Sequence, residues 1–271
     1  MSSIGIVAGN GQFPHIAAAE ASKKNKQVFI VGIKNEADAS LGTYAEAMQW
    51  VKLGQMGKLM RFFKKHQVKD IFFAGKITKT SLWKGHVWPD WHAIKMMAPT
   101  RDRKDDTLLG AVCTYLNQNG FHVLECGELM SDHMAPEKTI TKKKPSKSQL
   151  EDIQFGWELA KQMGQLDVGQ TVVVKDKAVM AIEAIEGTDE AVLRGGSLCK
   201  EGAVIVKVAK PNQDMRFDVP AVGVATLNTM HTAKASVLAI EAGKSLILDY
   251  DEFVKTADQL GLIVVGFQSS K

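Results

Sequence analysis

Short apolar runs that end at glycine recur through the first half of the chain, and segments with helical spacing separate them. A buried strand reads as an almost continuous apolar run, whereas an amphipathic helix repeats its apolar positions every three to four residues. The pattern predicts strands at 4–8, 27–32, 70–75 and 121–124, and helices at 14–24, 56–66 and 110–119. Strands that alternate with helices at this spacing indicate a parallel sheet and therefore a Rossmann-like α/β domain.

The character of the chain changes between residues 131 and 148, where prolines and lysines replace apolar residues. Beyond this segment the pattern predicts helices at 149–163, 229–242 and 251–260, and strands at 171–174, 178–186, 203–208, 246–248 and 262–265. We therefore expect a Rossmann-like domain at 1–130, a linker at 131–148 and a distinct α/β domain at 149–271 that carries the acidic catalytic segment. Clefts between domains commonly hold ligands, so we expect the ligand there.

Composition narrows the class of protein. The 271 residues are 45% hydrophobic and 24% charged, as in ordinary globular proteins, and the net charge of +4 is too small to indicate a nucleic-acid partner. Three cysteines without a CxxC spacing argue against a zinc ribbon and a disulfide framework. The N-terminus lacks signal-peptide features and no run of 18 apolar residues occurs, which favours a cytoplasmic protein. The Lys142-Lys143-Lys144 run could contact anionic lipid, or belong to a solvated linker.

A glycine loop follows the first predicted strand and opens the first predicted helix. It comprises Gly9, Asn10, Gly11, Gln12 and Phe13, followed by a proline. Backbone N–H groups at such a helix N-terminus bind phosphate. The third glycine of the dinucleotide fingerprint is missing, which makes a nucleotide phosphate a better ligand than NAD. A tight strand-to-helix turn without a ligand is the alternative.

Two further segments of the first half carry candidate binding residues. Gly75 and Lys76 end a buried strand, where glycine permits close approach of a ligand and lysine supplies a point charge for phosphate. The glycine spacing of a Walker motif is absent. Asp106 precedes a predicted helix and could either cap it or bind substrate.

An acidic turn stands at the end of the predicted strand 178–186. Its residues are Glu186, Gly187, Thr188 and Asp189, and Gln170 lies at another strand end nearby in the sequence. The glycine lets the backbone approach a ligand, and the carboxylates can meet a cation or sugar hydroxyls. We expect Glu183 to point to solvent or to a partner strand, and Glu190 and Arg194 to form an i,i+4 pair.

Asp218 is the strongest single candidate for catalysis. It lies between Phe217 and Val219-Pro220, an apolar context that a merely solvated carboxylate does not need. Carboxylates and substrate phosphates are the usual ligands of Mg²⁺, so we expect Asp218, Asp189 and Glu186 to hold this ion, or another divalent cation in its place. Lys210 and Arg216 would neutralise charge that develops on the reacting phosphorus.

Other hydrolase signatures are missing. The seven histidines show no HExxH or HxH spacing and no GxSxG occurs. The stretch 76–104 is rich in tryptophan and methionine. Its Trp83, Trp88, Trp91, Met96 and Met97 could line an acyl-chain groove or belong to the core.

Taken in order, several motifs resemble one known family over essentially the whole chain. They are IGIVAGNGQFP, FAGKI, DDTLL, LDVGQTVVV, MAIEAIEGTDE, VAKPNQDMRFDVPAVGVATL and AGKSLILD. Together they resemble the LpxI-type UDP-2,3-diacylglucosamine pyrophosphatases of bacterial lipid A synthesis. The combination of EGTDE with RFDVPAVG is specific, whereas the glycine loop alone is not.

The resemblance implies a function. It implies metal-dependent hydrolysis of UDP-2,3-diacylglucosamine to UMP and 2,3-diacylglucosamine 1-phosphate (lipid X), with Mg²⁺ as the usual ion and Asp218 as the essential aspartate. It also implies a protein of a Gram-negative bacterium that acts in the cytoplasm and could contact the inner membrane peripherally; a homodimer is left open. The alternatives are a non-catalytic nucleotide- or lipid-binding α/β protein and, on the glycine loop alone, an NAD-dependent oxidoreductase.

Overall fold

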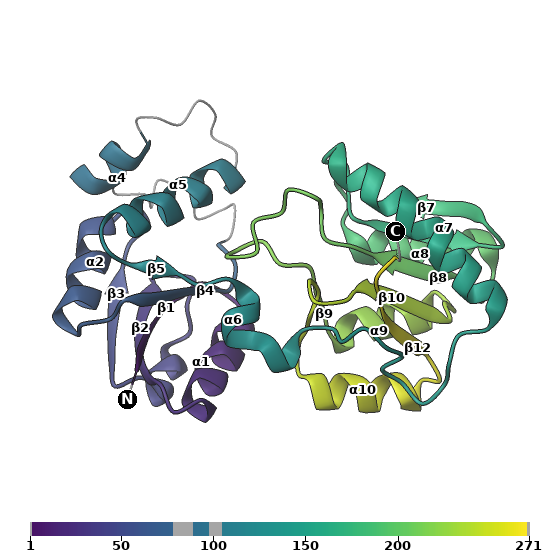
Figure 1. The fold of residues 1–271 in the computed structure, drawn as a ribbon, viewed down its shortest axis with the longest axis horizontal. Helices are drawn as coiled ribbons and strands as arrows, with labels where there is room; N and C mark the ends of the chain where they lie inside the picture. The colour runs from purple at the N-terminus through teal and green to yellow at the C-terminus, as the bar shows by residue number, and fades with distance from the viewer. Residues whose placement is uncertain (1, 78–88, 98–104, 270–271) are drawn as a thin grey trace. The chain divides into compact units, whose positions relative to one another are not determined.

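A computed structural model describes residues 2–77, 89–97 and 105–269 (Figure 1). The chain folds into two compact units that do not follow the sequence strictly. The first unit contains Met1–Ser131 and also Asp214–Asp218, and the second contains Asp132–Gln213 and Val219–Lys271. A five-residue segment from the second half of the chain therefore belongs to the first unit.

The first unit is built on a five-stranded, fully parallel sheet of order β3-β2-β1-β4-β5. Its strands are β1 (Ser3–Ala8), β2 (Gln27–Ile33), β3 (Ala47–Val51), β4 (Asp70–Ala74) and β5 (His122–Val123). Its helices are α1 (Phe13–Lys23), η1 (Ala39–Tyr44), α2 (Met56–Lys65), α4 (Trp91–Met97), α5 (Asp105–Gln118) and α6 (Cys126–Met130). The predicted Rossmann-like arrangement of strands and helices is confirmed.

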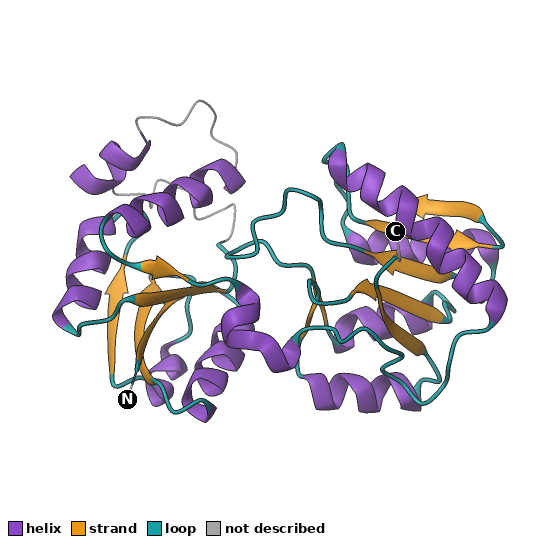
Figure 2. Ribbon diagram, in the orientation of Figure 1, coloured by secondary structure: helices purple, strands orange, loops and turns teal. Residues whose placement is uncertain are grey.

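Alternate residues of the strands pack on opposite faces of this sheet, and helices cover both faces (Figure 2). Val7, Val31 and Ile71 join a core with Phe63 of α2 and Leu116 of α5. On the opposite face α1 packs against β1, β2 and β4. Burying large side chains such as these stabilises a fold by about 1.5–3 kcal/mol each. The continuous apolar runs in the sequence follow from this burial on both sides.

The second unit has a mixed five-stranded sheet of order β12-β10-β8-β6-β7. The strands are β6 (Thr171–Lys175), β7 (Ala178–Ile182), β8 (Val204–Lys207), β10 (Val237–Glu241) and β12 (Ile263–Phe267), and β9 (Ala221–Val222) pairs separately with β11 (Leu246–Ile247). The helices are η2 (Ser131–His133), which spans the boundary between the units, α7 (Lys147–Gln165), α8 (Thr188–Cys199), α9 (Val224–Thr232) and α10 (Tyr250–Gln259). Strands β8, β10 and β12 are parallel, whereas β6 runs antiparallel to both β8 and β7.

The predicted helix 229–242 is wrong. Helix α9 ends at Thr232, and Val237–Glu241 form β10, which lies between β12 and β8 in the sheet. Lys234 has a positive φ of 51°, which stops the helix because this conformation cannot continue it. The alanine-rich sequence has helical propensity, but residues 237–241 are all buried between the two faces of the sheet, and tertiary packing overrides propensity.

The segment that the sequence places in a linker pairs with the second unit. The Ile140 N–H donates to the Val264 carbonyl at 2.8 Å, and the Val264 N–H donates to the Thr141 hydroxyl at 3.0 Å. The Lys142 N–H donates to Asp258 at 2.9 Å. These bonds fix the backbone beside the lysine run, while the side chain of Lys142 is 88% exposed. Contact of this run with anionic lipid stays a prediction.

The aromatic stretch divides between core and surface. Met96 lies in the core of the first unit, whereas Trp91 is 73% exposed and Met97 is half-exposed. Trp83 and Trp88 lie outside the described residues. Among the helices of the described ranges, none is both long enough and apolar enough to cross a membrane.

Candidate functional site

Two loops meet at the carboxyl ends of β1 and β4. The Gly9 N–H donates to the Ala74 carbonyl at 2.8 Å, and Asn10 and Lys76 exchange backbone hydrogen bonds of 2.7 and 2.9 Å. A Cβ at Gly9 would lie 2.5 Å from the Lys76 carbonyl oxygen. Gly75 has a φ of +90°, and a Cβ there would lie 2.7 Å from the Asn10 carbonyl oxygen. Both glycines are therefore required for the two loops to approach each other.

The start of α1 is suited to bind an anion. Gln12 is the N-cap residue and makes no side-chain cap hydrogen bond, and Pro14 occupies the first turn. Gly11 has a φ of +103° and open space around it. Backbone N–H groups and the helix dipole at such an end attract phosphate. The exposed Lys76 adds a positive charge on the neighbouring loop.

The position of this loop in the sheet matches known ligand sites. The strand order runs through β2 and β3 on one side of β1 and through β4 and β5 on the other. Open α/β sheets bind ligands outside the carboxyl ends of the strands at such a switch point. The glycine loop and Gly75-Lys76 both lie at this edge.

The structure gives the positions of Phe13 and Asp106 in their helices. The Phe13 ring packs edge-on against Phe72 with centroids 5.9 Å apart, which is a core contact. Helix α5 begins at Asp105, so Asp106 lies within its first turn rather than before it. Substrate contact by either residue stays a prediction.

The segment Asp214–Asp218 packs on the first unit beside the end of β5. The Cys126 N–H donates to the Met215 carbonyl at 2.9 Å, and Phe217 packs against the core of the first unit. Because β5 is parallel to β4 and adjacent to it, this contact lies at the same edge of the sheet as the glycine loop. The fold thus brings Asp218 to the edge that carries the predicted phosphate-binding loop, although the two are far apart in sequence.

Arg216 is bound by a carboxylate of its own segment. Its Nε donates to Asp214 Oδ1 at 2.8 Å, its terminal nitrogen donates to Asp214 Oδ2 at 2.5 Å, and its N–H donates to Oδ1 at 3.1 Å. The guanidinium holds the pKa of Asp214 below its usual value, and the carboxylate raises the pKa of Arg216. The positive charge expected to face the reacting phosphorus is therefore largely neutralised by Asp214.

A buried polar cluster lies at the end of β8 in the second unit. Lys207, the last residue of β8, donates from Nζ to the Thr188 hydroxyl at 3.0 Å. The Thr188 hydroxyl donates in turn to Glu183 at 2.9 Å, and the Gln170 N–H lies 3.4 Å from the other Glu183 oxygen. The side-chain oxygen of Gln170 is buried and has no hydrogen-bond partner. Of the predicted site residues, Gln170 and Thr188 are brought together here.

The prediction that Glu183 faces solvent is wrong, whereas the alternative of a partner strand agrees with its backbone bond to Thr171 of β6 at 2.9 Å. Glu183 is only 8% exposed, and a Cβ at Gly169 would lie 2.0 Å from its carbonyl oxygen. Strand β7 ends at Ile182, so the backbone turns and carries the Glu183 carboxylate toward Thr188. Glu183 stands two residues after the buried Ala181, and this alternation is the signal that could have placed it inside.

The predicted pair of Glu190 and Arg194 is also wrong. Arg194 donates to Glu186 at 2.6 Å and to the Ile182 carbonyl at 2.9 Å. Gly187 adopts a φ of +86°, and this turn places Glu186 beside the helix where an i,i+4 partner was expected. Hydrogen bonds from the backbone and from Arg194 lower the pKa of Glu186.

The residues proposed as metal ligands do not form one cluster. The parts of the chain that the structure describes hold no group of three or more His, Cys, Asp or Glu side chains suited to a metal ion. Glu186 accepts from Arg194 through one oxygen and from the Ala184 N–H through the other. Asp218 belongs to the first unit, and Glu186 and Asp189 belong to the second. Metal binding by Asp218, Asp189 and Glu186 stays a prediction, and it requires the substrate phosphates to supply further ligands.

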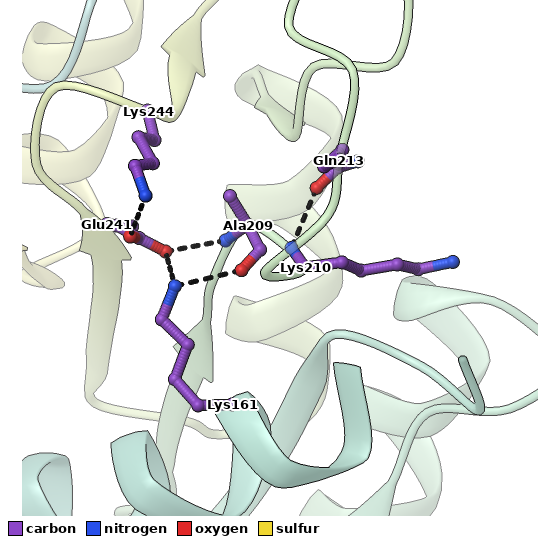
Figure 3. A network of polar contacts seen from close by, with 6 residues as sticks. All are labelled: Lys161, Ala209, Lys210, Gln213, Glu241 and Lys244. Atoms are coloured by element: carbon purple, nitrogen blue, oxygen red, sulfur yellow. Dashed lines mark hydrogen bonds and ion pairs between the residues drawn. The ribbon is translucent and has the colours of Figure 1, made fainter. Parts of the chain in front are cut away.

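A second network in the second unit holds the start of the loop that leads to Asp218 (Figure 3). The buried Glu241 accepts from Lys161 at 2.5 Å, from the Ala209 N–H at 2.8 Å, and lies 3.3 Å from Lys244. Lys161 also donates to the Ala209 carbonyl at 2.9 Å. The next residue, Lys210, forms an ion pair of 2.6 Å with Asp167. The candidate Lys210 thus follows a rigidly held residue.

Sequence reasoning missed Asp214, Glu183 and Lys207. Asp214 stands two residues before an arginine, a spacing common in solvated loops, and only its hydrogen bonds to Arg216 in the folded segment distinguish it. Lys207 reads as the end of an apolar strand, and its charge is only 7% exposed. A lysine inside a valine-rich run was a signal that a buried partner must exist.

Comparison with known proteins covers both units. The family models named LpxI N-terminal domain and LpxI C-terminal domain match residues 3–133 and 136–265. A protein of Caulobacter vibrioides named UDP-2,3-diacylglucosamine pyrophosphatase LpxI is 29% identical over 277 residues, which is 98% of each chain.

Solved structures resemble the chain only distantly. N5-carboxyaminoimidazole ribonucleotide synthetase from Thermotoga maritima is 13% identical with a TM-score of 0.27, and the match covers 69% of this chain but 42% of that one. The phosphoribosylaminoimidazole carboxylase ATPase subunit from Aquifex aeolicus gives 16% identity, a TM-score of 0.22, and coverage of 50% and 33%. At these scores they support no functional argument. The two LpxI domain models together span nearly the whole sequence, and this chain belongs to the LpxI family.

Proposed function

We propose that this chain hydrolyses the pyrophosphate bond of UDP-2,3-diacylglucosamine and releases UMP and 2,3-diacylglucosamine 1-phosphate, a step of lipid A synthesis. The relationship to the Caulobacter vibrioides protein over 98% of both chains supports the substrate. The observation that carries the proposal is the packing of Asp214–Asp218 at the carboxyl edge of the first sheet, where the open glycine loop also lies.

In this proposal the first unit holds the pyrophosphate. The N–H groups at the start of α1 donate to phosphate oxygens, and Lys76 supplies a positive charge beside them. Asp218 would hold a divalent cation such as Mg²⁺ together with the substrate's own phosphate oxygens. When bound, such a cation polarises a phosphoryl oxygen and lowers the pKa of water. Because Arg216 is paired with Asp214, we assign it to holding the Asp218 segment rather than to the phosphate.

The second unit, taken by itself, has polar groups suited to an uncharged ligand group. The unpartnered Gln170 oxygen can accept from a sugar hydroxyl or an amide N–H, and Thr188 is oriented by Glu183 and Lys207. The charge of Lys210 is already offset by its ion pair with Asp167, so we give it a secondary role.

The direct test is incubation of the protein with UDP-2,3-diacylglucosamine and Mg²⁺, with UMP measured by chromatography. We expect UMP release that chelation by EDTA abolishes and added Mg²⁺ restores. Intact substrate and no UMP would contradict the proposal. Binding of UMP or of the diacyl sugar phosphate without turnover would favour the non-catalytic alternative.

The role of Asp218 is tested by Asp218→Asn. Removing the carboxylate charge should lower kcat about 10³-fold, within the range for an essential group of a catalytic site. The matched control is Glu46→Gln, because Glu46 is an exposed carboxylate of the same unit that no part of the proposal uses. Near-normal turnover of the Asp218 variant would refute its assignment.

A further inference from the structure

The segment Asp214–Asp218 has no covalent neighbour in the unit on which it lies. Gln213 before it and Val219 after it both belong to the second unit. Its place on the first unit therefore depends on non-covalent contacts. The candidate catalytic Asp218 is its last residue, so these contacts decide where its carboxylate lies.

Asp214 organises the segment from both its side chain and its backbone. Its carboxylate binds the Arg216 guanidinium through two oxygens and also accepts the Arg216 N–H. Its carbonyl accepts the N–H groups of Phe217 at 3.2 Å and Asp218 at 2.9 Å. Bidentate pairs between arginine and carboxylate fix orientation as well as distance. The turn that ends at Asp218 is thus built around Asp214.

The other contacts join this turn to the first unit. The Met215 carbonyl accepts the Cys126 N–H, and Phe217 packs against the core that contains Cys113. The Arg216 guanidinium interacts electrostatically with Glu125 on the first unit. Arg216 therefore connects the Asp214 carboxylate, around which the turn is built, to the first unit.

We propose that Asp214 and Arg216 form a clip that positions Asp218 at the carboxyl edge of the first sheet. Both are positioning residues and act through Asp218, so the proposal rests on the proposed function of that carboxylate. The Asp214–Arg216 ion pair builds the turn, and Arg216 also interacts with Glu125 of the first unit. Loss of either Asp214 or Arg216 should therefore release the segment while the two units stay folded.

The first measurement is turnover by Asp214→Asn, Arg216→Gln and the double variant. Displacement of a reacting group by about 1 Å can cost about 10²-fold in rate, so each single variant should lose about that factor in kcat with a small change in KM. The double variant should lose no more than the worse single one, because one clip is broken in each case. Additive losses, or a rise in KM confined to the Arg216 variant, would show that Arg216 contacts substrate directly and would overturn the proposal.

The second measurement reports docking without substrate. Cys113 and Cys126 are buried, and burial raises their pKa to about 11 and about 12, so both should react slowly with a thiol reagent. Cys199 is only half-buried and is first replaced by serine. Arg216 and Asp214 act electrostatically on the Cys113 thiol, so both lie near it. In the Cys199-free background, release of the segment should therefore speed labelling of Cys113 in both clip variants. Unchanged labelling would overturn the proposal.

Two controls separate this inference from the proposed function. Asp218→Asn should lose turnover while its thiols stay protected, because the clip is intact. Arg216→Lys keeps the charge but not the fork, and should fall between wild type and Arg216→Gln in both measurements. If wild type releases no UMP, the proposed function fails while the labelling still decides whether the clip holds the segment. A fall in melting temperature that accompanies uniform loss of active protein, with kcat per folded molecule unchanged, would reduce the clip to a structural role.

Discussion

The two units treat the polar groups at the carboxyl ends of their strands in opposite ways. In the first unit the N-cap of α1 makes no side-chain bond, and an exposed lysine stands on the neighbouring loop. In the second unit Lys161 and Glu241 satisfy each other and the backbone, and Lys207, Thr188 and Glu183 form a chain of contacts. The carboxyl ends of the strands in the first unit are suited to bind an external anion. In the second unit, most charged groups at the strand ends are already paired with groups of the protein itself.

This difference indicates which ligand groups can bind at the strand ends of each unit. A ligand phosphate at the first edge replaces water on open N–H groups and gains hydrogen bonds. A phosphate near Lys210 in the second unit gains less, because the Asp167 carboxylate already offsets the charge of that lysine. Uncharged hydroxyl and amide groups meet a lower barrier there, since the buried Gln170 oxygen has no partner to lose.

The largest effect on this contrast is expected from Gly9→Ala. The new Cβ would lie 2.5 Å from the Lys76 carbonyl and force the two loops of the first edge apart. We expect about a 10²-fold loss of kcat/KM, because the phosphate-binding groups would be displaced. Gly110→Ala is the control, since nothing lies within 4 Å of its Cβ position. Normal kinetics in the Gly9 variant would remove the loop from the site.

Next in size is Glu241→Ala in the second unit. The change leaves Lys161 without its carboxylate and the Ala209 N–H without its acceptor. We expect a loss of about 2–3 kcal/mol in the free energy of unfolding, measured by urea denaturation, because part of a buried ion pair is left uncompensated. Lys244→Ala, which removes a half-exposed partner, should cost less than about 1 kcal/mol. Equal losses would show that the network is not what holds this edge.

A smaller effect is expected from Glu183→Gln. The amide keeps an acceptor for Thr188 but loses its charge, so unfolding should become about 1–2 kcal/mol easier. If Thr188 orients the sugar, KM should rise while kcat changes little. Glu190→Gln is the control, because Glu190 is an exposed carboxylate on α8, the helix that contains Thr188. A fall in kcat alone would instead place Glu183 near the reacting phosphorus.

The clip in the first unit should depend on pH with a defined sign. The pKa of Asp214 in the folded protein lies below its ordinary value because Arg216 binds the ionised form. Its stabilisation is therefore complete above the pKa of the unfolded chain and is lost as pH falls through the lower folded value. Protection of Cys113 should persist at pH 5 and decrease below pH 4 in wild type, measured with a reagent active in acid. If the protection of Cys113 falls by the same factor between pH 5 and pH 4 in the Asp214→Asn variant, the pH dependence arises from other groups.

The smallest effect is expected from Glu186→Gln. Its pair with Arg194 lies on the surface, and exposed pairs contribute little. Turnover and its dependence on Mg²⁺ should be unchanged, since Arg194 and a backbone N–H already occupy the carboxylate. A raised Mg²⁺ requirement in this variant would indicate that Glu186 is a metal ligand. The strand ends of the second unit would then also bind an external ion.

The local pattern of the first half predicted most of its fold but not all of it. Strands such as 4–8 were predicted because both faces are buried and the run ends at glycine. Strand β3 was missed because its sequence AMQWV is half-buried at the sheet edge and interrupted by a glutamine. Near β10 the chain favoured a helix locally, and only burial between α7 and the helices of the opposite face makes it a strand.

The candidate site was predictable only where local chemistry determines it. The glycine loop could be found because close approach and an open helix start require particular residues. The sequence does not reveal that Asp218 belongs to the first unit, because this follows from contacts such as the hydrogen bond between Met215 and Cys126. No periodicity in the sequence encodes a contact between positions so far apart.

The same five residues have a consequence for the order in which the protein is made. Synthesis runs from the N-terminus, so everything up to Ser131 leaves the ribosome long before Asp214 is added. The first unit can form its sheet during translation, yet it receives Phe217 and Asp218 only after most of the second unit exists. A nascent chain stopped before residue 214 would thus carry a folded but incomplete edge, and catalytic competence would arise late, in one step, near the end of synthesis.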